Sequence, residues 1–125
     1  MKNTITVDSD VIIEYLKTGE GKLVDAYEKY DMVIAPSTYT EILASTTFSE
    51  DYLEKEVMNF LKEYFVTQVI NEEIALLAAR IIRQKKEKIT LAHALVAATA
   101  INSSTPLLTN RKETYSDIGG LELLE

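Results

Sequence analysis

The sequence predicts an α/β protein built around a mainly parallel sheet, because short apolar runs alternate with longer amphipathic segments over its 125 residues. In the long segments, apolar residues recur at the spacing of one helix face, whereas short runs are rich in β-branched residues. No internal repeat, linker or low-complexity tract interrupts this alternation. We therefore expect one domain over residues 1–125, long enough to bury a substantial core.

The first part of the chain is predicted to hold a strand at 5–7, helices at 9–17 and 21–29, a strand at 32–35 and a helix at 36–45. The first strand passes into its helix at Asp8 with no turn between them. The sequence Thr-Gly-Glu-Gly ends that helix, since glycine disfavours a helix interior. Pro36 suits the first turn of the third helix, where its missing N–H costs little.

The rest of the chain continues the alternation. We expect a loop at 45–49, a helix at 50–63, a strand at 65–69, helices at 72–86 and 91–102, a strand at 106–108, a loop or short helix at 109–116 and a last strand at 121–124. Asn71 caps a helix that begins with acids and ends with bases, which matches the helix dipole. The helix that Thr90 caps is apolar almost all round and is expected to be buried.

Composition narrows the possible functions. Acidic residues outnumber basic ones by 20 to 13, which gives a formal net charge of −7 and argues against a broad basic face for nucleic acid. A local basic strip is still compatible with this charge. The absence of cysteine excludes disulfides and thiolate metal sites and suits a reducing cytoplasm. The N-terminus lacks a signal-peptide pattern, and no apolar run approaches the roughly 18 residues that span a bilayer, so we expect a cytoplasmic protein without membrane contact.

Polar side chains at the predicted junctions of strands and helices are the candidate functional residues. They are Asp8 after the first strand, Glu41 in the helix after the second, His93 in the helix before the fourth, and Thr109, Asn110 and Arg111 after the fourth. The carboxyl ends of parallel strands share one edge of the sheet, where ligands bind in open α/β folds. We therefore expect these groups to converge.

Four segments carry a resemblance to a known family. They read VDSDVIIEYLK, APSTYTEILA, LAHALVAATAI and PLLTNRKETYSDIGGLELL. In order and spacing they resemble PIN-domain proteins, in particular the VapC-type toxins of toxin–antitoxin pairs. The resemblance implies a three-layer α/β/α sandwich in which acids at one sheet edge bind Mg²⁺ or Mn²⁺ and cut RNA. It also implies a homodimer and a protein antitoxin.

The resemblance assigns the first two acids of the family to Asp8 and Glu41, with Ser9 as the hydroxyl residue beside the first. The third acid of the family, an Asp before Ala-Leu, is replaced by His93. One imidazole with two carboxylates suits Mn²⁺, Fe²⁺ or Zn²⁺ better than Mg²⁺, which prefers oxygen ligands. His93 also sits near a helix N-terminus, where a positive charge is disfavoured, so we expect a neutral ring.

The closing segment departs from the family at a second position. It reads Thr109-Asn110-Arg111, where Thr-Arg-Asn or Thr-Arg-Asp is usual, so Arg111 stands at the fourth polar position. An arginine there would add a positive charge to a site that binds cations. Arg111, Asn110 and Lys112 are candidates for holding RNA phosphate, because they leave the sheet edge directly. Ser9 and Thr109 are also expected on the substrate side of the site.

Two hypotheses follow. The first is a VapC-like, metal-dependent endoribonuclease with an atypical site, in which Asp8 and Glu41 bind the ion, His93 is a third ligand or a proton carrier, and Arg111 or Asn110 holds phosphate. The alternative is a PIN fold that has lost catalysis and binds RNA or protein. The substitutions at His93 and Arg111 are the reason to consider it.

Each candidate also has a structural explanation. Asp8 could only cap its helix, Glu41 could be solvated, and His93 could be a core or capping residue. Asp10 faces the cleft or supports the helix N-terminus, and Asp117 could supply a missing acid. The basic tract at 83–88 is typical of a solvated helix end, with RNA contact as the alternative.

Overall fold

The computed structural model describes residues 2–45 and 51–125 of the chain. Within them, four strands form one sheet in the order β3–β2–β1–β4, and every pairing is parallel. The strands are β1 (Asn3–Val7), β2 (Tyr30–Ile34), β3 (Val66–Thr67) and β4 (Leu107–Leu108). Ile5 lies opposite Met32, and Thr6 lies opposite Leu107. The predicted parallel sheet is confirmed, and β1 has a neighbour on each side.

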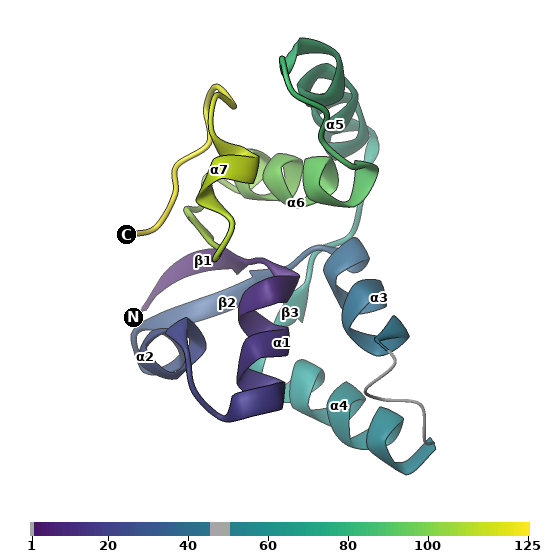
Figure 1. Ribbon diagram of the computed structural model, residues 1–125, viewed down its shortest axis with the longest axis vertical. Coiled ribbons are helices and arrows are strands. Elements are labelled where there is room, and N and C mark those ends of the chain that lie inside the picture. The colour runs from purple at the N-terminus through teal and green to yellow at the C-terminus, as the bar shows by residue number, and fades with distance from the viewer. Residues whose placement is uncertain (1, 46–50) are drawn as a thin grey trace.

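The helices are α1 (Ser9–Thr18), α2 (Lys22–Lys29), α3 (Pro36–Ala44), α4 (Asp51–Tyr64), α5 (Glu72–Gln84), α6 (Leu91–Asn102) and α7 (Lys112–Tyr115). Figure 1 shows α1, α2 and α4 on one side of the sheet and α5, α6 and α7 on the other. The third helix, α3, packs against α1, α4 and α6. This is the expected three-layer α/β/α sandwich.

Each face of the sheet has its own apolar core. Ile5 and Val7 of β1 pack in the cluster under α1, α2 and α4, while Leu107 of β4 packs in the cluster with α5 and α6. Because successive strand residues point to opposite faces, Thr6 is turned away from the Ile5 cluster. Its hydroxyl is hydrogen-bonded to that of Thr105 at 2.7 Å. The inner strand β1 is thus buried on both faces from Ile5 to Val7, whereas Val66 of the edge strand β3 is 66% exposed.

Most predicted elements are confirmed within two residues, but two strands differ. The strand expected at 65–69 is only Val66–Thr67, because the Phe65 N–H still donates to Leu61 O at the end of α4. The strand expected at 121–124 is wrong, since it forms a single parallel bridge between Leu107 and Leu123. Both backbone hydrogen bonds of this bridge involve Leu107, whose N–H donates to Glu122 O and whose O accepts the Leu124 N–H, each at 2.9 Å.

The other boundaries differ from the predicted ones by at most two residues. The second strand begins at Tyr30, two residues earlier than predicted, and ends at Ile34. Ala35, predicted to be in this strand, is the N-cap residue of α3. Gly19 ends α1 in the left-handed conformation, with φ 74°. Of the loop predicted at 45–49, residues 46–49 lie outside the described residues, as does residue 50 of the next helix. No helix in the described ranges has the length and apolarity that a membrane crossing requires.

Candidate functional site

Asp8 lies at the carboxyl end of β1 and is also the N-cap residue of α1. Its side chain is fully buried. Oδ1 accepts the Ser9 N–H at 2.8 Å, while Oδ2 accepts the hydroxyls of Thr109 at 2.8 Å and Tyr115 at 2.9 Å. Three donors therefore satisfy a carboxylate that has no exposure to water. The capping role and the predicted position at the sheet edge are both correct.

Tyr115 is a site residue that the sequence reasoning did not single out. It comes from α7, is 2% exposed, and places its hydroxyl on Asp8. Burial, followed by the charges of Asp8 and Asp10, raises the pKa of Tyr115 far above its ordinary value. The hydroxyl thus stays protonated and donates. The available signal was a tyrosine at the position where the family pattern has phenylalanine.

Asp10, in the first turn of α1, also faces this edge. Its carboxylate accepts the Asn110 N–H, at 3.2 Å to Oδ2, while the Asn110 side chain donates to Glu14 Oε1 at 3.1 Å. Burial raises the pKa of Asp10, and the neighbouring Asp8 charge adds to that effect; the Asn110 N–H and Arg111 act in the opposite direction. Asn110 is therefore engaged with α1 at both its backbone and its side chain.

Arg111 connects α1 to α6. Its Nε lies 3.4 Å from Asp10 Oδ2, and its Nη1 lies 2.8 Å from His93 Nε2. His93 is in the first turn of α6, where its N–H donates to the Thr90 hydroxyl at 3.1 Å. Because arginine can only donate, His93 Nε2 must accept, which requires a neutral ring with the proton on Nδ1. The expected neutral imidazole agrees with this contact.

Glu41 occupies a different environment. It is half-buried on α3, and its Oε1 is buried with no hydrogen-bond partner in the described part of the chain. The same holds for Ser37 Oγ and Thr38 Oγ1 on that helix. Since α3 packs against α1 and α6, Glu41 lies on a helix adjoining those that carry the other groups. No hydrogen bond or ion pair among the described residues joins it to Asp8 or His93.

The remaining predicted residues divide between this edge and the surface. Ser9 acts on Asp8 through its backbone N–H, and Thr109 through its hydroxyl. Lys112 is 3.4 Å from Glu125, away from the edge. Asp117 is exposed after α7. In the basic tract, Lys85 donates to Ser116 O at 2.9 Å.

This arrangement does not fit a site for a hard divalent cation. Such an ion needs several oxygen ligands with free lone pairs. Asp8 Oδ2 already accepts two hydroxyls, and both Asp10 Oδ2 and His93 Nε2 face the Arg111 guanidinium. A search of residues 2–45 and 51–125 finds no group of three or more acids and histidines that could hold an ion. The edge holds a guanidinium among carboxylates instead.

Comparison with known proteins decides the family. The family model of the PIN domain matches residues 5–119. The chain belongs to the PIN domain family. The resemblance seen in the four sequence segments is thereby confirmed. No curated protein matches the sequence.

Solved structures agree with the PIN fold. A chain of VapBC-1 from nontypeable Haemophilus influenzae superposes with a TM-score of 0.82 at 18% identity, over 98% of this chain and 97% of that one. DNA-bound VapBC from Salmonella typhimurium gives 0.81 at 14% identity, over 99% and 98%. FitAcB from Neisseria gonorrhoeae gives 0.70 at 17% identity, over 97% and 96%. At such identities these likenesses establish the fold.

Proposed function

We propose that this PIN-domain protein is a VapC-type toxin that acts on RNA as a metal-dependent endoribonuclease, with an atypical site whose affinity for Mg²⁺ or Mn²⁺ is low. The observation that carries the proposal is Asp8, an acid fixed by three donors at the carboxyl end of an inner strand. The VapBC neighbours support the toxin assignment. Weak activity is expected because a guanidinium lies where the family pattern has an acid.

The proposed roles follow from the positions of the side chains. Asp8 and Glu41 are the two acids retained from the family pattern, and the unpartnered Glu41 Oε1 is the carboxylate oxygen that is free to accept a ligand. Ser9 and Thr109, expected on the substrate side, act by fixing Asp8. Arg111, with 47% of its side chain exposed, is the group best placed to meet an RNA phosphate.

A second candidate function is a PIN fold that binds RNA or protein without cleavage. The observation that favours it is the Arg111 guanidinium between Asp10 and His93. A positive charge in that place works against the metal on which hydrolysis would depend. The candidate differs from the first in one measurable property, metal-dependent turnover of RNA.

Cleavage of a panel of structured RNAs, with Mg²⁺ and with Mn²⁺, separates the two candidates. We expect slow cleavage by the wild type, none by Asp8→Asn or Glu41→Gln, and faster cleavage by His93→Asp. The control is Asp31→Asn, which changes an exposed acid on β2. Absence of metal-dependent cleavage in the wild type would sink the enzyme proposal, and cleavage unaffected by Asp8→Asn would indicate a contaminant.

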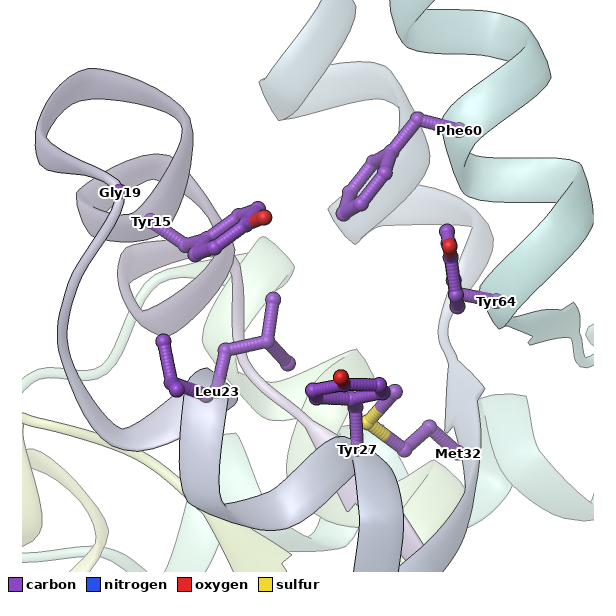
Figure 2. Close-up of a pocket in the computed structure, with 8 residues that line it drawn as sticks. Tyr15, Gly19, Leu23, Tyr27, Met32, Phe60 and Tyr64 are labelled. Carbon is purple, nitrogen blue, oxygen red and sulfur yellow. The ribbon is translucent and has the colours of Figure 1, made fainter.

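An antitoxin partner is the second part of the proposal. Figure 2 shows side chains of α1, α2, β2 and α4 turned toward one another around a pocket of about 340 Å³, here called the aromatic pocket. It is lined by Tyr15, Gly19, Leu23, Val24, Tyr27, Met32, Phe60 and Tyr64. Large apolar side chains remain exposed at its rim, such as Tyr27 at 44% and Tyr64 at 42%. An apolar helix of an antitoxin would bury them.

Co-purification with the antitoxin encoded beside the gene tests this surface. We expect Tyr27→Glu to abolish co-purification and Leu91→Glu, at an exposed apolar residue of α6, to leave it unchanged. Equal recovery of both variants would contradict the assignment. The homodimer and the cytoplasmic location remain predictions from the resemblance and the composition.

A further inference from the structure

The backbone of Arg111 is fixed in relation to Asp8. Its N–H donates to Thr109 Oγ1 at 2.9 Å, and the same hydroxyl donates to Asp8 Oδ2 at 2.8 Å. Lys22 Nζ adds a hydrogen bond to Thr109 O at 2.8 Å. The residue therefore leaves β4 at a defined point beside the buried carboxylate. Its side chain then has a short path to Asp10 and His93, which lie in the first turns of α1 and α6.

The guanidinium reaches two acceptors on different helices. Asp10 Oδ2 lies 3.4 Å from Nε, and only 12% of the Asp10 side chain is exposed. His93 Nε2 lies 2.8 Å from Nη1. Both atoms are of the kinds that a divalent ion would use, one a carboxylate oxygen and the other a neutral imidazole nitrogen. The hydrogen bond from Nη1 occupies the one free lone pair of His93 Nε2, and the ion pair places the guanidinium charge against Asp10 Oδ2.

The neighbouring contacts hold His93 in this position. Its ring lies edge-on to Tyr115, with 5.7 Å between ring centroids, and the hydroxyl of Tyr115 is bonded to Asp8. Asp8, Tyr115, His93, Arg111 and Asp10 thus form a continuous chain of contacts. Of the two carboxylates in this chain, Asp8 is satisfied by three donors, whereas Asp10 has the guanidinium charge beside it. A divalent ion at the same acceptors would meet that charge at close range.

We propose that the Arg111 guanidinium is the resident cation of this edge and keeps divalent ions out of it. The inference rests on the proposed function, because it concerns the same site, and it explains why that site is weakened. Metal and guanidinium compete for Asp10 and His93, so binding of one requires departure of the other. With half of its side chain exposed, Arg111 can move away without opening the core.

Binding of Mn²⁺ alone, without RNA, tests the proposal. Wild type, Arg111→Asn and Arg111→Gln are titrated with MnCl₂ by calorimetry, and thermal unfolding is followed with and without the ion. We expect both variants to bind Mn²⁺ about tenfold or more tightly than the wild type, since a repelling charge has been removed. The same variants should show the larger rise in melting temperature on adding Mn²⁺. Two variants are used so that one misfolded protein does not decide the result.

Lys112→Asn is the matched control. It removes the same charge from the adjacent residue, whose Nζ is paired with Glu125 rather than with the edge. We expect its Mn²⁺ affinity to equal that of the wild type. Wild-type affinity in both Arg111 variants would overturn the proposal. A gain in Lys112→Asn as large as in Arg111→Asn would also overturn it, because the effect would then reflect net charge alone.

The outcome is separable from that of the proposed function. Mn²⁺ binding gained by the Arg111 variants, with no RNA cleavage by any protein, would reject the ribonuclease and support the resident cation. Cleavage by the wild type, with no gain of Mn²⁺ affinity in either variant, would support the ribonuclease and reject the resident cation.

Discussion

The two acids that the sequence places at this edge have opposite environments. Asp8 is fully buried and accepts three hydrogen bonds from three residues. Glu41 is half-buried, and its Oε1 finds no donor in the described ranges, like the hydroxyl oxygens of Ser37 and Thr38. A buried polar atom without a partner costs stability, whereas a satisfied one contributes to it. The difference indicates that Asp8 has a structural role as well as any chemical one, while Glu41 is available to a ligand.

Removal of the Asp8 carboxylate should cause the largest loss of stability. Asp8→Ala leaves three buried donors unpaired, and at about 1 kcal/mol for each we expect a loss of about 3 kcal/mol in the free energy of unfolding. Urea denaturation measures it. Asp31→Ala, at an exposed acid of β2, should change stability by less than about 0.5 kcal/mol. A loss below about 1 kcal/mol for Asp8→Ala would mean that the donors find other acceptors.

Removal of one donor should have a smaller effect of the same sign. Tyr115→Phe keeps the buried ring and deletes one hydrogen bond to a charged group, so we expect a loss of about 1.5 kcal/mol. The control is Tyr30→Phe, because the Tyr30 hydroxyl has no hydrogen bond to the described residues. Equal stability losses in the two variants would show that the hydroxyl of Tyr115 does little for Asp8.

Substitution of Glu41 should show most clearly that Asp8 and Glu41 contribute differently to stability. Glu41→Gln removes a charge whose buried oxygen has no donor, so we expect stability to stay within about 0.5 kcal/mol or to rise. The control is Glu54→Gln, at an exposed acid of α4. A loss above about 1 kcal/mol would give Glu41 a structural role like that of Asp8 and would remove the contrast.

The smallest expected effect is a pH dependence that arises at Asp10. Its folded-state pKa is raised above 3.8, mainly by burial, with the charge of Asp8 adding to this. Between 3.8 and the raised pKa, the folded state binds more protons than the unfolded state, so the free energy of unfolding falls as pH rises through that window. The Asn110 N–H and Arg111 oppose the shift and keep the effect small.

Comparison of wild type with Asp10→Asn isolates this contribution. The difference in their unfolding free energies should favour the wild type increasingly as pH falls toward 3.8. Chemical denaturation at a series of pH values measures that difference. Parallel stability curves for the two proteins would assign the pH dependence to other groups.

The secondary structure could be predicted well from local pattern, except at the short strands. The α6 helix agrees with its predicted range, 91–102, because its apolar composition and the Thr90 cap are local signals. The strand predicted at 121–124 became a single bridge, because it pairs with Leu107 of β4 alone. Which residues of another strand will pair with a segment is not visible in the segment itself.

The sequence predicted which residues lie at the candidate site, but not all of the contacts between them. The sequence placed Asp8, Thr109 and Arg111 at one edge, and hydrogen bonds link the three in the structure. It did not reveal that Tyr115 donates to Asp8, over a separation of 107 residues. Nor did it reveal that Arg111 contacts His93, since which side chains meet depends on how α6 and α7 pack on the sheet.

By itself, the sequence determined the α/β/α fold and the PIN family, because periodicity, caps and motif spacing are properties of the chain. Only the tertiary structure decided which side chains contact one another at the sheet edge. Burial fixes the hydrogen bonds of Asp8, and helix packing brings Asp10 and His93 within reach of one guanidinium. The interaction between two charges depends on the distance between them in space, and the linear sequence does not show that distance.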